Sequence, residues 1–276
     1  MKNMVMTSFL LSAAICIGTA AFAAPPLRHG VGRGRSPVTT QEAAEVKKAN
    51  EKSKRRIAPY LMDEGSSGRL TWKEYTVNPK AKGEATLLVV FGGRDSVNDG
   101  RGEAKIPVAI EKAISHASLL PRSGRLIVLV PDMMVGESRR GRGGRETPVS
   151  EGMPKLVRSR MEKHGVKAER TFATGFSMGG GLVYSLLNDD PTLFARALVV
   201  GASGNPNATK DIRAEILDYH GADDDYIPAV RVKAFAEAVN AKTPGRMRLE
   251  TLDKTGHAES ETAAYSKNDA WKWLFR

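Results

Sequence analysis

A serine in the second half of the chain has the sequence context of a nucleophile. Residues 175–179 read Gly-Phe-Ser-Met-Gly, a G-x-S-x-G pattern centred on Ser177. In this pattern a sharp turn between a strand and a helix lifts the serine hydroxyl out of the sheet. The two glycines fit because a side chain at either position of so tight a turn would collide with neighbouring backbone. Ser177 is therefore a candidate for covalent catalysis.

A serine hydroxyl is inert at neutral pH unless a base takes its proton, and the base needs an acid that orients it. His257 follows the last strand that we expect in the chain, and it is the only histidine after the acidic turn at residues 223–225. The chain order serine, acid, histidine is the order that this type of turn requires. We predict that His257 is the base.

The acid lies in the turn that residues 220–228 form, where three aspartates follow one another at 223–225. The pattern H-G-x-x-D-x-x-[IV]-P over this turn favours Asp224 among the three. The other two are then turn or surface groups, as acidic residues in turns commonly are. His220 begins the turn, and we interpret it as a structural hydrogen-bonding residue.

Strands and helices alternate along the chain in an order that would position these residues. Apolar runs predict a strand at 170–174 before the serine, a helix at 180–187 after it, and a strand at 197–200. Further strands are expected at 70–77 (as an edge strand), 85–91, 125–130, 215–219 and 247–252, and further helices at 41–57, 106–117, 151–164, 229–240 and 259–275. This alternation predicts an α/β fold with a mostly parallel sheet and helices on both faces. Ligands bind such sheets at the carboxyl ends of the strands.

Two backbone amides are expected to stabilise a negatively charged oxygen during the reaction. One belongs to Met178, directly after the serine, and the other to the loop after the strand at 85–91, where we choose Gly93. An arginine in the same loop, Arg94, is a candidate substrate-binding residue. The chain needs no metal and no organic cofactor for this chemistry.

The N-terminus has the features of a signal peptide, which we place at residues 1–23. Lys2 is followed by an apolar run at 9–17 and by an Ala-Phe-Ala cleavage signal at 21–23. The run is too short to span a membrane, so it indicates export to the periplasm or the medium. We interpret residues 24–65 as a basic flexible segment and 66–276 as the catalytic domain. The single cysteine of the chain falls within the signal peptide, so the mature protein has no disulfide.

Positive charge dominates the chain, whose formal net charge is +11. Basic residues concentrate at 28–56 and at 139–145, and solvated loops explain such runs in most proteins. The second run follows a strand and should border the carboxyl ends of the sheet. We therefore name Arg142 and Arg145 as candidate contacts to an anionic substrate, since the planar guanidinium suits carboxylate and sulfate.

From about residue 85 to residue 275 the chain resembles the α/β-hydrolases, in particular secreted feruloyl esterases, acetyl xylan esterases and polyhydroxybutyrate depolymerases. The matching stretches are 87–93, 131–132, 173–180, 220–228 and 256–257. The resemblance implies an α/β-hydrolase fold and an ester substrate. The segments between the three candidate residues are short, so we expect no large lid.

Three functions remain open on the sequence. The leading one is a secreted serine esterase acting on a polymeric or polysaccharide-linked ester, with an anionic polysaccharide as one candidate. A serine peptidase of the same fold would act on amides instead. A non-catalytic protein that binds polyanions would need no nucleophile. The arginine- and glycine-rich tail is also compatible with nucleic acid, but the export signal argues against that partner.

Overall fold

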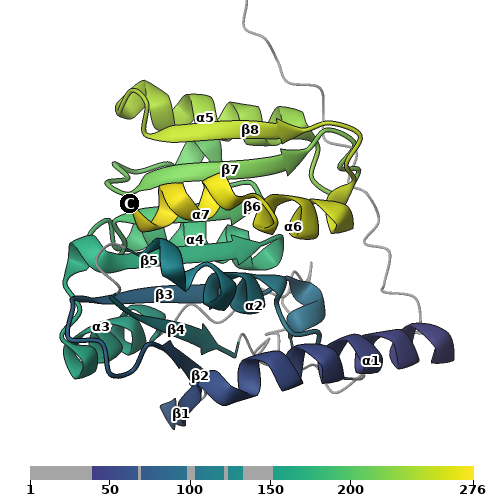
Figure 1. The fold of residues 1–276 in the computed structure, drawn as a ribbon. Coiled ribbons are helices and arrows are strands. Elements are labelled where there is room, and N and C mark those ends of the chain that lie inside the picture. The colour runs from purple at the N-terminus through teal and green to yellow at the C-terminus, as the bar shows by residue number, and fades with distance from the viewer. Residues whose placement is uncertain (1–38, 68–69, 98–102, 121–123, 133–151) are drawn as a thin grey trace, which may run out of the picture. The chain divides into compact units, whose positions relative to one another are not determined.

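The fold is built on one eight-stranded sheet with the strand order β1-β2-β4-β3-β5-β6-β7-β8 (Figure 1). The structure is a computed structural model that describes residues 39–67, 70–97, 103–120, 124–132 and 152–276. The strands are β1 (Leu61–Ser67), β2 (Leu70–Val77), β3 (Ala85–Phe91), β4 (Arg125–Pro131), β5 (Thr171–Phe176), β6 (Arg196–Val200), β7 (Glu215–Gly221) and β8 (Met247–Leu252). β2 is antiparallel to β1 and β4, and every later pair is parallel.

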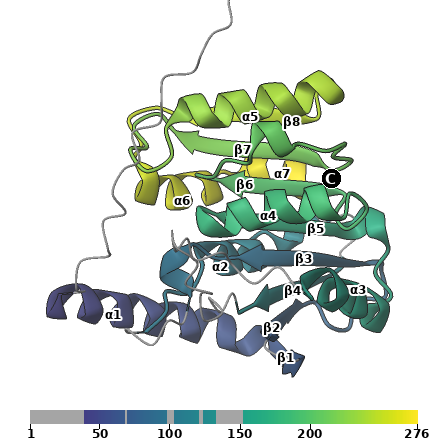
Figure 2. The same ribbon diagram turned by 180° about the vertical axis from the view of Figure 1, so that it is seen from behind.

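Helices cover both faces of this sheet, as Figures 1 and 2 show from opposite sides. The helices are α1 (Thr40–Ile57), α2 (Val108–Ser115), α3 (Met153–His164), α4 (Met178–Asp189), α5 (Ala229–Lys242), α6 (His257–Tyr265) and α7 (Asn268–Phe275). Alternate residues of β3 enter two separate cores: Leu87 and Val89 pack with α3, α4 and α5, whereas Leu88 and Val90 pack with α1, α2, α6 and α7. The predicted mostly parallel sheet with helices on both faces is confirmed.

None of the helices that the structure describes is both long and apolar enough to cross a lipid bilayer. The described residues also contain no inserted lid domain. The predicted signal peptide lies outside the described residues, and so does the basic run at 139–145.

One edge of the sheet differs from the sequence prediction. The alternating residues of β2 predicted an edge strand, which is wrong, because β1 pairs with β2 on its outer side. β1 carries few apolar residues and was not expected. It is held instead by polar contacts, since Asp63 accepts a hydrogen bond from Arg160 of α3 at 2.6 Å. The compact unit of the chain begins at Thr39, so the boundary that we placed after residue 65 falls within β1.

The C-terminal helix, predicted as one element over 259–275, is two helices. α6 ends at Tyr265 and α7 begins at Asn268. The turn between them lets Trp271, which is fully buried, donate its indole N–H to the carbonyl oxygen of Tyr265 at 2.9 Å. Helical periodicity alone does not reveal such a break, because both helices present apolar residues to the same core.

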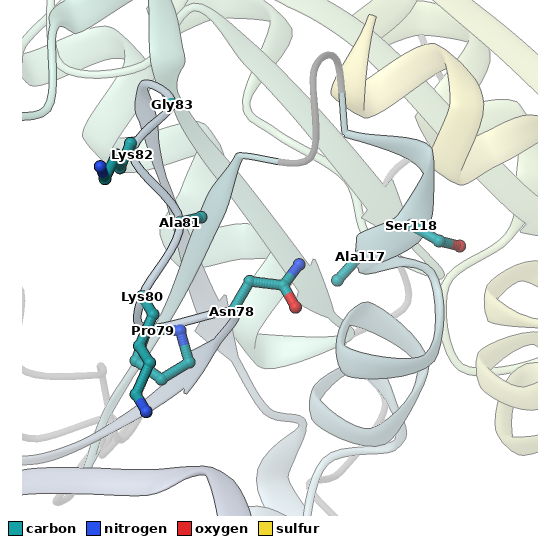
Figure 3. Close-up of a pocket in the computed structure, with 8 residues that line it drawn as sticks. All are labelled: Asn78, Pro79, Lys80, Ala81, Lys82, Gly83, Ala117 and Ser118. Carbon is teal, nitrogen blue, oxygen red and sulfur yellow. The ribbon is translucent and has the colours of Figure 1, made fainter.

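A shallow hollow lies at the amino-terminal end of the parallel strands (Figure 3). It is lined by the turn at residues 78–83, between β2 and β3, and by Ala117 and Ser118. Ligands of open parallel sheets bind at the opposite end, outside the carboxyl ends of the strands. None of the candidate residues Ser177, Asp224 and His257 lines this hollow.

Candidate active site

Ser177 occupies a strained turn between β5 and α4. Its backbone has φ 52° and ψ −116°, a conformation that residues other than glycine rarely adopt. The Ser177 N–H donates to the carbonyl oxygen of Val200 at 2.9 Å, which ties the turn to the end of β6. Such strain persists only where the surrounding structure enforces it, and it is common at functional sites.

The glycines beside Ser177 allow backbone to approach backbone. A Cβ atom on Gly179 would lie 2.4 Å from the carbonyl oxygens of both Phe91 and Gly92. A Cβ atom on Gly175 would lie 2.5 Å from the carbonyl carbon of Gly179. The loop after β3 therefore lies close to the first turn of α4, which only glycine at these positions permits. A tight turn of this kind is what the G-x-S-x-G pattern predicts.

The three side chains singled out by the sequence form one hydrogen-bonded line. His257 Nε2 lies 2.8 Å from Ser177 Oγ, and His257 Nδ1 lies 2.7 Å from Asp224 Oδ2. A carboxylate only accepts hydrogen bonds, so Nδ1 carries the proton and Nε2 is left to accept the serine hydroxyl. Asp224 is buried, whereas its neighbours Asp223 and Asp225 are exposed.

Further hydrogen bonds hold Asp224 in place. Its Oδ1 accepts the backbone N–H groups of Tyr226 at 3.0 Å and Ile227 at 2.8 Å. The buried His220, at the end of β7, donates from Nε2 to the carbonyl oxygen of Ile227 at 2.7 Å. The same Nε2 lies 3.5 Å from Asp224 Oδ2. His220 thus fastens the turn that carries the acid, which agrees with the structural role that we inferred for it.

His257 begins helix α6, and α6 is fastened at its first turns. Ser260 Oγ donates to the carbonyl oxygen of His257 at 2.7 Å. Glu261, which is buried, accepts the Nζ of Lys105 at 2.8 Å and the N–H of Val108 at 3.4 Å. Because Val108 is the first residue of α2, this carboxylate joins the start of α2 to the helix that carries the histidine.

Two aromatic residues that we did not single out enclose the His257 ring. The ring of Phe176 lies 5.1 Å from it and the ring of Tyr226 lies 5.3 Å from it, measured between centroids. Phe176 is the second residue of the G-x-S-x-G pattern. Tyr226 is an aromatic residue in an otherwise acidic turn, and that unusual composition is the signal that sequence reasoning missed.

The two backbone amides proposed for a negatively charged oxygen lie on either side of the turn. Met178 is the first residue of α4, where a helix leaves its N–H groups without internal acceptors. Gly93 is buried, and a Cβ atom there would lie 2.8 Å from the Phe176 ring. The Gly93 N–H donates to no residue that the structure describes. Both amides therefore remain candidate donors to an oxygen bound beside Ser177.

The predicted arginine contacts divide into two groups. Arg94 is exposed directly after Gly93, at the start of a short 3₁₀ helix, Arg94–Ser96. It thus lies on the loop that packs against the serine turn. Arg142 and Arg145 lie outside the described residues.

Comparisons with known proteins find similarity to a family model in sequence and to several solved structures in fold. A family model described as phospholipase/carboxylesterase matches residues 148–266. A thermostable esterase has a TM-score of 0.63 at 20% identity, over 80% of this chain and 64% of its own. The feruloyl esterase module from Clostridium thermocellum has a TM-score of 0.56 at 12% identity, over 78% and 87%. Esterase 2 from Thermogutta terrifontis has a TM-score of 0.54 at 16% identity, over 76% and 91%.

These likenesses have limits. The chain spans less than two thirds of the length of the thermostable esterase. No curated protein matches it by sequence. At identities of this size a structural likeness establishes the fold, and function has to be argued from the site.

Proposed function

We propose that this chain, an α/β-hydrolase superfamily member, is a serine esterase that hydrolyses carboxylic esters through an acyl-enzyme. The observation that carries the proposal is the hydrogen-bonded line from Ser177 through His257 to Asp224. The same arrangement of nucleophile, base and acid serves acyl transfer on several unrelated folds. The esterases among the structural neighbours support the same reaction class.

Acylation begins when the ester carbonyl carbon lies next to Ser177 Oγ. The oxygen attacks that carbon while His257 Nε2 accepts its proton, and the π electrons of the carbonyl move onto the carbonyl oxygen. Asp224 keeps the imidazole oriented and stabilises its positive charge. The N–H groups of Met178 and Gly93 donate to the new oxyanion, and one such donor is typically worth about 10²–10³ in rate.

The intermediate then expels the alcohol. The carbonyl re-forms, the bond to the alcohol oxygen breaks, and His257 Nε2 delivers its proton to that oxygen. A water molecule attacks the acyl group on Ser177 in the same way, with His257 again accepting a proton. The bond between the acyl carbon and Ser177 Oγ then breaks, His257 Nε2 returns its proton to that oxygen, and the carboxylic acid leaves.

We propose further that the protein acts outside the cytoplasm, on the basis of the signal-peptide features of residues 1–23. The basic run that contains Arg142 and Arg145 follows β4 in the sequence, which supports an anionic group in the substrate.

The test is hydrolysis of p-nitrophenyl acetate, butyrate and octanoate by the wild type and by Ser177→Ala. We expect kcat to fall by about 10⁴-fold or more, because the variant has no nucleophile. Labelling by a fluorophosphonate probe should disappear with it. The matched control is Ser185→Ala, an exposed serine two turns along α4, which should keep both properties.

Two results would contradict the proposal. One is a wild-type protein that neither hydrolyses any of the esters nor reacts with the probe. The other is an ester hydrolysis rate that Ser177→Ala leaves unchanged.

A further inference from the structure

Two exposed apolar side chains follow the candidate acid along the chain. The large hydrophobic residues exposed in the described part of the chain are Leu61, Met62, Tyr226 and Val230. The first two belong to the edge strand β1. Tyr226 and Val230 come two and six residues after Asp224 and are 76% and 70% exposed. Apolar groups left in water beside catalytic residues indicate contact with a ligand.

The Tyr226 ring lies next to the His257 ring. Its backbone N–H donates to Asp224 Oδ1 at 3.0 Å, so its position is coupled to the acid. Its ring lies 5.3 Å from the His257 ring with 35° between the planes. The ring nevertheless stays mostly in water, which leaves an aromatic surface free beside the histidine. Val230 extends the apolar character into the first turn of α5.

The proposed mechanism fixes which half of an ester lies beside Tyr226. His257 Nε2 must deliver a proton to the alcohol oxygen, so that oxygen lies about 3 Å from Nε2 when the alcohol leaves. The acyl carbonyl oxygen is directed instead to the amides of Met178 and Gly93. An alcohol group larger than a methyl therefore extends over the His257 side of the site, where Tyr226 is exposed.

We propose that Tyr226 and Val230 form a binding surface for the alcohol half of the ester, selecting an uncharged alcohol that carries a ring. This inference rests on the proposed esterase function. A flat aromatic face binds another ring by stacking. Asp223 and Asp225, both exposed, precede Tyr226 in the same turn, and their charges disfavour a negative charge on the part of the alcohol that meets Tyr226. Tyr226 is thus a specificity-determining residue.

The experiment compares esters that share one acyl group and differ in the alcohol. Methyl acetate and benzyl acetate are hydrolysed by the wild type, Tyr226→Ala and Tyr226→Phe, and kcat/KM is measured. This parameter covers the steps up to acylation, when the alcohol is still bound. We expect Tyr226→Ala to lower the benzyl-to-methyl ratio of kcat/KM about fivefold or more. Tyr226→Phe keeps the ring and should keep the ratio.

Met62→Ala is the matched control, since it removes an apolar side chain that is 59% exposed from the far edge of the sheet. It should leave the ratio unchanged. A second series, with methyl esters of acetic and phenylacetic acid, tests the acyl side and should respond less to Tyr226→Ala than the alcohol series does.

Three outcomes overturn the inference. An equal fall on methyl and benzyl acetate means that Tyr226 only positions His257. A larger change in the acyl series than in the alcohol series means that Tyr226 contacts the acyl half of the ester and not the alcohol half. An unchanged ratio in an active Tyr226→Ala protein shows that the ring contacts no substrate. By contrast, a wild type that is inactive on every ester overturns the esterase proposal itself, before any variant is compared.

Discussion

The candidate site and the interior of the protein share two elements, helix α4 and strand β7, but surround their polar groups differently. Helix α4 starts at the candidate site, directly after Ser177, and carries Tyr184 in the interior. Strand β7 has Asp218 in the interior and leads to Asp224 at the candidate site. Each element therefore carries one polar group of interest in each region.

The two buried aspartates show the difference. Asp224 receives two backbone N–H groups on one oxygen and the His257 Nδ1–H on the other. Asp218 receives only the hydroxyl of Tyr184, and its Oδ1 has no hydrogen-bond partner among the described residues. Burial, only partly offset by the Tyr184 hydrogen bond, raises the pKa of Asp218 well above its ordinary value. Both aspartates are buried, so the two positions differ in the number of hydrogen bonds that each carboxyl group accepts and not in burial.

The largest effect is expected from exchanging each aspartate for asparagine. Asp224→Asn should lower kcat about 10⁴-fold, because the amide cannot hold the histidine in the tautomer that accepts the serine proton. Asp218→Asn, on the strand that leads to Asp224, should remain active, since Asp218 takes no part in the proposed chemistry. Steady-state kinetics on p-nitrophenyl butyrate measures both. Equal losses in the two variants would remove the distinction between the regions.

A smaller effect is expected from adding one methyl group to α4. Gly179→Ala places a Cβ atom 2.4 Å from two backbone oxygens, so the loop after β3 or the serine turn must move. We expect a destabilisation of about 1–3 kcal/mol and a fall in kcat of about 10²-fold, because catalysis tolerates little misplacement. Urea unfolding and kinetics measure the two effects.

Gly181→Ala is the matched control for this change. It lies two residues further along α4, where an added Cβ atom meets nothing within 4 Å. Alanine is the better helix former, so we expect a gain of about 0.5–1 kcal/mol in the free energy of unfolding and normal kinetics. Equal damage by both substitutions would mean that the approach of the β3 loop to α4 is not the cause.

The smallest effect concerns the pH dependence of stability. The pKa of Asp218 is higher in the folded protein than in the unfolded chain, where an aspartate has a pKa of about 3.9. The group therefore favours folding at low pH, and this contribution is lost as the pH rises from about 4 towards the folded pKa. The asparagine in Asp218→Asn does not titrate. The free energy of unfolding of this variant should therefore rise relative to that of the wild type as the pH increases.

Urea unfolding of both proteins between about pH 4 and pH 9 measures this difference. Parallel curves for the wild type and Asp218→Asn would contradict the raised pKa. If Asp218→Asn instead gained stability relative to the wild type as the pH falls, folding would lower the pKa of Asp218 rather than raise it.

Much of the fold could be predicted because its signals are local. The continuous apolar run of β3 and the helical spacing of α4 identify their elements without any knowledge of their neighbours. β1 could not be predicted, because its polar residues are stabilised by partners distant in sequence such as Arg160. The break between α6 and α7 likewise depends on a contact, the one from Trp271 to Tyr265.

The candidate site divides in the same way. The sequence by itself determined the serine turn, because the requirement for glycine beside Ser177 is a local backbone constraint. It also narrowed the base to His257 and the acid to three neighbouring aspartates. The catalytic roles of these residues stay predictions until the variants are measured.

Only the tertiary structure decided that Asp224 meets His257, and that Tyr226 covers the histidine while staying in water. Asp224 and His257 lie 33 positions apart along the chain, and Asp224 and Tyr226 share a turn in which one residue is buried and the other exposed. Which side chain of that turn faces His257 depends on the backbone path of the turn and on the register of the strands beside it, and neither is encoded in a local pattern.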